Sequence, residues 1–134
     1  MKFLMLFIIL SVSVSAKPAV KEGKHSLTLQ WIEGKGSINF VKKGKSEFEV
    51  SGEQKSSKTE DFLKMEGVIQ VRSSTELEFT GKIETQVSYI NDGKVCVRDG
   101  KHTFKAYGKR KYWRMQDKIN CDGKVTDYID IYFQ

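Results

Sequence analysis

The sequence predicts an all-β domain, an antiparallel meander of about eight or nine strands that closes into a small barrel. Three observations predict this fold. Apolar and polar residues alternate along much of the chain, short turn dipeptides separate the alternating runs, and no long apolar stripe at helical spacing occurs. At 134 residues the chain has the length of one small domain. A sandwich of two packed sheets is the alternative architecture for the same strands.

The first 16 residues have the pattern of a signal peptide. A single lysine precedes an apolar stretch from Phe3 to Leu10, and small residues follow as far as Ala16. The apolar stretch is shorter than the roughly 18 residues that a membrane-spanning helix needs. We therefore expect residues 1–16 to be removed, and residues 17–134 to form one exported domain, periplasmic or secreted, with no stable membrane anchor.

The exported domain opens with three short alternating runs. Their apolar positions are Leu27, Leu29, Trp31, Ile38, Phe40, Phe48 and Val50. The glycine-containing turns at Gly34–Gly36 and Lys43-Gly44 separate these runs. Such short connections favour antiparallel neighbours, so we expect three adjacent strands.

Two longer alternating runs follow, at residues 63–72 and 76–90. In the second run the predicted inner face consists of Leu77, Phe79, Ile83, Val87 and Tyr89. Gly67 and Gly81 interrupt the inner faces of the two runs, and a glycine in mid-strand marks a bend or a close approach of backbones. We expect two long strands in a sheet that curls over.

Three predicted strands, at residues 94–98, 101–107 and 111–116, continue the meander. Asp99-Gly100 is the predicted turn between the first two, because this dipeptide tolerates the positive φ angles of tight hairpins. Further turns are predicted at Asp92-Gly93, Gly108-Lys109 and Asp122-Gly123.

The chain has two cysteines, Cys96 and Cys121, which can form one disulfide in an oxidising compartment. The bond would close a loop of about 26 residues and contribute roughly 3.5 kcal/mol of stability. In a flat meander the two cysteines would lie about 9.6 Å apart, beyond the roughly 6.8 Å limit between bridged Cα atoms. Either residues 117–123 fold over the end or face of the sheet, or the sheet closes on itself. We expect a structural role for this disulfide.

The C-terminal segment predicts a final strand. Its alternating apolar positions are Val125, Ile129, Ile131 and Phe133. An acidic strand here can pair with the basic hairpin that precedes it. Ion pairs from Asp127 or Asp130 to Arg114 or Lys111 would then neutralise part of the positive charge.

The formal net charge of +6 concentrates in two segments. Residues 17–46 carry seven Lys and two Glu, and residues 101–118 carry seven basic residues and one Asp. The second segment predicts a hairpin at residues 101–114 whose tip is Gly108–Arg110. Arginine grips phosphate or carboxylate in a bidentate manner, lysine attracts anions, and aromatic faces accept bases or sugars. The predicted ligand-binding residues are Lys105, Tyr107, Lys109, Arg110, Lys111, Tyr112, Trp113 and Arg114.

These features favour a non-enzymatic module that contacts an anionic ligand or surface, a glycan, a lipid headgroup or a nucleic acid. The chain has only two histidines and lacks the usual metal-ligand spacings, so we expect no metal site and no cofactor.

Three alternatives remain open. One is an envelope protein that binds or inhibits an acidic exported protein. A second is a carrier of a small apolar molecule, whose cavity would be lined by Leu63, Met65, Leu77, Phe79 and Ile83. The third is a small secreted ribonuclease-like hydrolase, with His25 and His102 as acid and base and Lys101 or Lys105 stabilising the phosphate.

Overall fold

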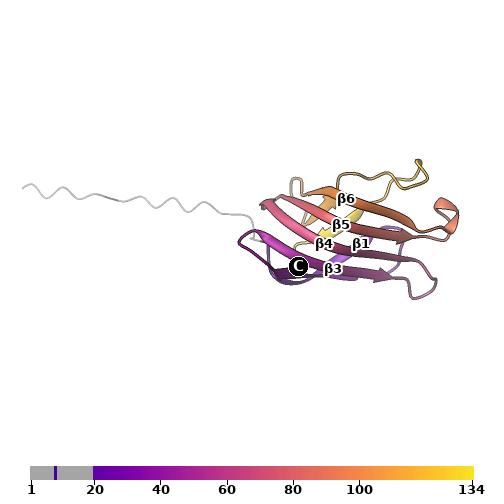
Figure 1. The fold of residues 1–134 in the computed structure, drawn as a ribbon, viewed down its shortest axis with the longest axis horizontal. Coiled ribbons are helices and arrows are strands. Elements are labelled where there is room, and N and C mark those ends of the chain that lie inside the picture. Colours follow the sequence, from indigo (N-terminus) through magenta and orange to yellow (C-terminus); the bar gives the residue numbers. More distant parts are fainter. Residues whose placement is uncertain (1–7, 9–19) are drawn as a thin grey trace, which may run out of the picture.

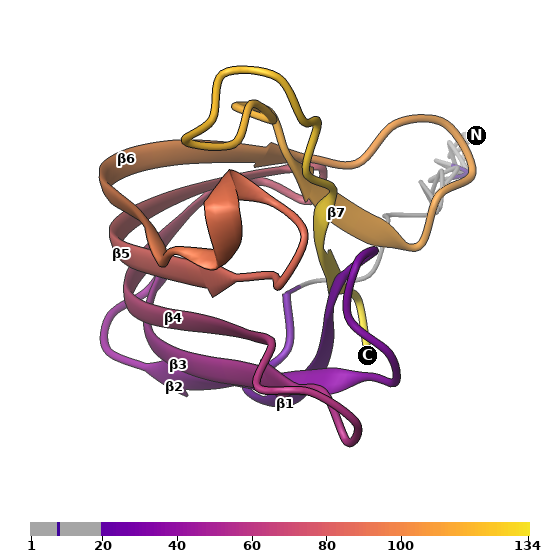
Figure 2. The same ribbon diagram turned by 90° about the vertical axis from the view of Figure 1, so that its right-hand side faces the viewer.

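The computed structural model describes Ile8 and residues 20–134, which form a closed antiparallel barrel. The strands follow one another around the ring in chain order, and the last pairs with the first (Figures 1 and 2). They are β1 (Gly23–Leu29), β2 (Gly36–Lys42), β3 (Glu47–Lys55), β4 (Phe62–Ser73), β5 (Glu76–Gln86), β6 (Cys96–Lys105), β7 (Tyr112–Met115) and β8 (Ile129–Tyr132). The predicted meander and its closure are confirmed. The predicted signal peptide, residues 1–16, lies outside the described residues apart from Ile8.

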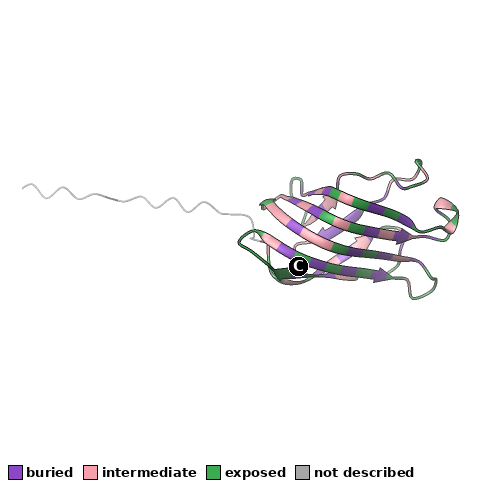
Figure 3. Ribbon diagram, in the orientation of Figure 1, coloured by how far each residue is buried: buried purple, intermediate pink, exposed green. Residues whose placement is uncertain are grey.

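Buried and exposed residues alternate along the strands, as Figure 3 shows. The inward side chains meet in one core, because each strand presents every second residue to the barrel axis. The largest fully buried members are Trp113, Phe40, Phe79, Phe104, Leu27, Leu29, Ile38, Leu63, Met65, Ile69, Leu77 and Ile83. The residues that a carrier would use to line a cavity are therefore packed against the rest of the core.

Three glycines form a row across β4, β5 and β6. Gly67 of β4 pairs with Gly81 of β5, which pairs in turn with Gly100 of β6. A Cβ atom at Gly67 would lie 2.3 Å from the carbonyl oxygen of Thr80, so only glycine permits this approach. The prediction that the sheet curls over is confirmed by the closed barrel.

Two predicted boundaries are wrong. Asp99-Gly100 is not a turn, because β6 runs through it without a break. Gly100 has a positive φ of 118°, as a turn glycine would, but here it lies inside a continuous strand. The run at residues 76–90 ends as a strand at Gln86, and Tyr89 is 68% exposed. Here the Asp61 carboxylate accepts hydrogen bonds from the backbone and hydroxyl of Ser88, in place of strand pairing.

The connection between β5 and β6 contains the predicted Asp92-Gly93 turn. It forms a short 3₁₀ helix, η1 (Asn91–Gly93), in which all three residues have positive φ. No helix in the described part of the chain is long and apolar enough to cross a membrane.

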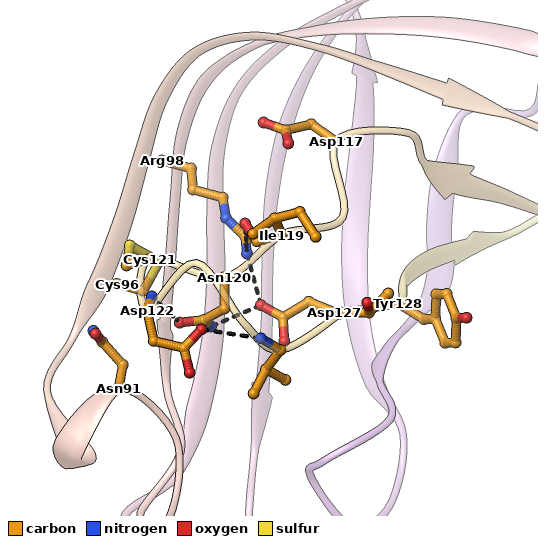
Figure 4. A network of polar contacts seen from close by, with 12 residues as sticks. Asn91, Cys96, Arg98, Asp117, Ile119, Asn120, Cys121, Asp122, Asp127 and Tyr128 are labelled. Atoms are coloured by element: carbon orange, nitrogen blue, oxygen red, sulfur yellow. Dashed lines mark hydrogen bonds and ion pairs between the residues drawn. A yellow bond between two sulfur atoms is a disulfide. The ribbon is translucent and has the colours of Figure 1, made fainter.

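The predicted disulfide joins Cys96 of β6 to Cys121 in the connection between β7 and β8, with Cα atoms 5.6 Å apart. Figure 4 shows this connection folded back beside β6. The side chain of Arg98 fixes it there, because Nη2 donates to the carbonyl of Ile119 at 2.8 Å and to the Asp127 carboxylate at 2.7 Å. The expectation that the 117–123 loop folds over, within a sheet that also closes, is therefore confirmed.

Asp127 is the centre of this polar network. Its side chain is 0% exposed, and besides Arg98 it accepts hydrogen bonds from Asn120 Nδ2 at 2.8 Å and Trp31 Nε1 at 2.9 Å. A buried carboxylate is tolerated when donors surround it in this way. The network ties the first loop of the barrel to its last loop.

Candidate anion-binding site

The predicted basic hairpin is present and its loop spans residues 106–111. Its strands pair through Phe104 with Met115 and Lys105 with Arg114. The backbone amide of Ala106 donates to the carbonyl of Thr75 at 2.8 Å, which attaches the start of the loop to the turn between β4 and β5. Figure 2 shows the loop extending beyond the barrel wall.

Trp113 anchors the hairpin from inside the barrel. Its ring is 2% exposed and lies 4.4 Å from the ring of Phe133, centroid to centroid. Its Nε1 donates to the carbonyl of Ser74 at 3.0 Å. The sequence predicted Trp113 as a flat face for a ligand, whereas the structure buries that face in the core. These contacts attach the hairpin to the core.

A cavity of about 620 Å³ lies between the tip of this loop and the neighbouring strands β8 and β1. The residues that line it are Lys21, Ser26, Lys35, Gly108, Lys109, Arg110, Lys111, Tyr132, Phe133 and Gln134. Lys109, Arg110 and Lys111 were predicted from the sequence. Lys21 and Lys35 were not, although both belong to the other basic segment of the chain, residues 17–46.

Barrel closure brings the two basic segments to one cavity. The chain that follows β8 runs between them: Phe133 N donates to the carbonyl of Lys111 at 2.9 Å, and Ser26 N donates to the carbonyl of Gln134 at 3.0 Å. The charge of residues 17–46 was visible in the sequence. Its position beside the hairpin depends on the pairing of β1 with β8.

The five cationic side chains of the cavity form no ion pair with any carboxylate in residues 20–134. The acidic residues of the N-terminal basic segment are engaged elsewhere. Glu33 lies 3.3 Å from Lys58, and Glu22 accepts a hydrogen bond from the backbone of Lys42 at 3.0 Å. The cavity therefore gathers five cationic side chains that form no close ion pair within residues 20–134.

Two other predicted cations are neutralised. Arg114 makes a bidentate ion pair with Asp130, at 2.7 Å and 2.9 Å, and this hydrogen-bonded carboxylate raises the pKa of the guanidinium above its usual value. The predicted ion pair between the last strand and the hairpin is thus confirmed for this pair. Lys105 lies 3.5 Å from Glu76. Neither side chain lines the cavity.

The predicted tyrosines lie near the cavity without lining it. Tyr112 faces outward on β7, with its ring 5.4 Å from that of Tyr132. Tyr107 is 52% exposed, and its hydroxyl donates to the side chain of Gln116 at 3.3 Å.

The two histidines do not form a joint site. His25 is buried, and its ring nitrogens lie 2.7 Å from the carbonyl oxygens of Lys21 and Tyr132. His102 is buried with neither ring nitrogen hydrogen-bonded, and its Nδ1 lies 3.9 Å from a carboxylate oxygen of Asp117. No hydrogen bond among the described residues links one imidazole to the other.

Comparison with known proteins places the chain in a family. The PM1083 family model matches residues 11–133. The chain is 37% identical over 112 residues to "Uncharacterized protein PM1083" of Pasteurella multocida (strain Pm70). The aligned residues cover 83% of this chain and 72% of that protein. No solved structure was found to match the chain. On the extent of these two matches, the chain belongs to the PM1083 family.

Proposed function

We propose that this protein is an exported, non-enzymatic binding module that holds an anionic ligand in the cavity under the 106–111 loop. The observation that carries the proposal is the convergence of Lys21, Lys35, Lys109, Arg110 and Lys111 on one cavity of about 620 Å³, with no carboxylate of the described residues paired to them.

Such a cavity selects for negative charge. Crowded cations repel one another, and a bound anion removes that repulsion while accepting their hydrogen bonds. Arg110 supplies a planar fork suited to a phosphate, sulfate or carboxylate group, and the four lysines act as point charges around it. Tyr132 and Phe133 contribute the apolar part of the lining.

Export is part of the proposal. The signal-peptide pattern of residues 1–16 supports it, and the Cys96–Cys121 bond fits an oxidising compartment. The mass of the protein recovered from its own cells tests it. The expected mass is that of a chain beginning at Lys17, less two hydrogen atoms, and a chain that retains residues 1–16 contradicts export by cleavage.

The cavity is tested by a variant with Lys109, Arg110 and Lys111 replaced by Gln. We expect the wild-type protein to be retained on phosphocellulose at moderate salt and this variant to pass through. The loop side chains are exposed, so the substitutions leave the core intact.

The matched control replaces Lys64, Lys82 and Lys101 by Gln. It removes the same amount of charge, but from lysines that are paired with Glu66, Glu84 and Glu78 on the outer face of β4, β5 and β6. We expect the control to be retained like the wild type. Equal loss of retention in both variants would show that net charge alone is responsible and would refute a site at the cavity.

A further inference from the structure

The outer face of β7 and β8, beside the cavity, carries a row of cations stacked on tyrosines. All five cation–π contacts found in residues 20–134 use the ring of Tyr112 in β7, of Tyr132 in β8, or of Tyr128, which directly precedes β8. The distances are from the charged group to the ring centroid. They are Lys35 over Tyr132 at 5.8 Å, Arg110 over Tyr112 at 5.7 Å, Arg114 over Tyr112 at 5.1 Å and over Tyr128 at 4.1 Å, and Lys118 over Tyr128 at 5.7 Å.

The strand register makes this row continuous with the cavity. Tyr112 pairs with Tyr132 across β7 and β8, and Arg114 pairs with Asp130. Lys35, Arg110 and Tyr132 belong to both the row and the cavity lining. Tyr128 directly precedes β8. At a rise of about 3.3 Å per extended residue, the row extends on the order of 13 Å from Tyr132 to Tyr128. One phosphate or carboxylate group cannot span this length.

The charge of the surface calls for a ligand with several negative groups. Asp130 offsets Arg114, but Lys118 and the five cavity cations make no ion pair within residues 20–134. A ligand with one charge would leave most of these cations uncompensated. A polyanion that lies along the row satisfies them together and releases the counterions that they hold.

The aromatic rings distinguish between two polyanions. Proteins that bind single-stranded nucleic acid present open aromatic faces on which bases stack. Here the ring of Tyr112 already carries Arg110 and Arg114, and the ring of Tyr128 carries Arg114 and Lys118. The surface therefore offers fixed cations and hydrogen-bond donors, which suit a chain of sugars that bears carboxylate or sulfate groups.

We infer that the ligand is a linear acidic glycan, with one negatively charged unit in the cavity and the next units along the outer face of β7 and β8. This inference rests on the proposed anion-binding function and adds the direction and the chemical class of the ligand.

The test measures binding of galacturonate oligomers of increasing length, and of a 20-nucleotide dT oligonucleotide, to the wild type and to Lys118→Gln. We expect affinity to rise with oligomer length. Lys118→Gln should weaken binding of the longest oligomer about tenfold, reduce its salt dependence by about one unit of slope, and leave the monomer unchanged. Lys124→Gln is the matched control, because Lys124 is an exposed lysine of the same connection and takes no part in the row.

The failures of the two proposals are distinguishable. If all lengths bind equally, or if Lys118→Gln and Lys124→Gln have the same effect, the extended glycan track is refuted while the cavity remains. Tighter binding of the oligonucleotide than of the longest galacturonate oligomer at equal salt also refutes the glycan. If the variant with Gln at positions 109, 110 and 111 binds every probe like the wild type, the cavity itself is refuted.

Discussion

His102 is a buried titratable side chain without hydrogen-bonded partners. It lies on the inner face of β6, is 8% exposed, and stacks at 6.5 Å on the ring of Phe79. Burial lowers its pKa, and the nearby charge of Arg98 lowers it too, while Asp117 acts in the opposite direction. The folded protein therefore takes up a proton at His102 at lower pH than the unfolded chain does.

This difference predicts acid sensitivity. Below about pH 6.5 the unfolded chain binds more protons at position 102 than the folded protein, so the free energy of unfolding falls as the pH falls. His102→Phe removes the titration and keeps a ring beside Phe79. Urea unfolding of both proteins between pH 5 and pH 8 checks this, and the variant should gain stability relative to the wild type as the pH falls. Parallel pH profiles would contradict the prediction.

Individual residues were predictable where alternation and charge sufficed. The Arg114–Asp130 ion pair follows from opposite charges on adjacent strands, and the disulfide follows from the cysteine count. Trp113 shows where this reasoning stops. Period-two alternation separates Trp113 from its neighbours Tyr112 and Arg114, but it does not say which of the two faces is the inner one. The core position is set by tertiary packing.

At the scale of the strands, close approach of backbones makes some glycines irreplaceable. A Cβ atom at Gly67 would lie 2.3 Å from the carbonyl oxygen of Thr80 and 2.9 Å from the Cα atom of Gly81, and rigid backbone cannot yield locally. We expect Gly67→Ala to destabilise the protein by roughly 1–3 kcal/mol, as measured by urea unfolding. Gly44→Ala is the control, because its nearest neighbour would be a side-chain atom 3.8 Å away. Equal stability of the two variants would contradict the close-approach argument.

The strands themselves were largely predictable, and β6 shows why their boundaries were not. Asp99-Gly100 is a strong signal for a hairpin turn, because glycine accepts positive φ. The φ of Gly100 is indeed positive, at 118°, but the residue is paired in mid-strand with Gly81. A positive φ at glycine is compatible both with a hairpin turn and with a bend inside a strand. The partner strand, which the dipeptide does not specify, decides between a turn and a bent strand.

At the scale of the whole molecule, the candidate site is a product of barrel closure. The hairpin was predictable from its composition, whereas Lys21 and Lys35 enter the cavity because β1 pairs with β8, about a hundred residues away in the chain. Sequence patterns specify the faces of strands but not which distant strands meet. In the sequence, the contribution of Lys21 and Lys35 to the cavity was therefore recognisable only as an excess of positive charge in residues 17–46.

The ladders between neighbouring strands differ in length, and we expect the barrel to open first at its short ladders, which flank β7 and β8. Eleven residue pairs join β4 to β5, whereas three join β1 to β8 and two join β6 to β7. We expect the backbone amides of β7 and β8 to exchange with deuterium faster than those of β4 and β5, by mass spectrometry or NMR. Short ladders bury few bonds and open at lower free energy. Equal protection in all strands would contradict this expectation.

The pairing of β1 with β8 also determines when the barrel can close. A chain that emerges N-terminus first presents β1 long before its partner β8 exists or has passed through a pore, so the ring stays open until nearly the last residue is free. Pairings this distant in sequence form slowly, and until then β1 is an unprotected edge. Under the export proposed above, the barrel would remain open while the chain crosses the membrane, and it would close only after β8 has crossed.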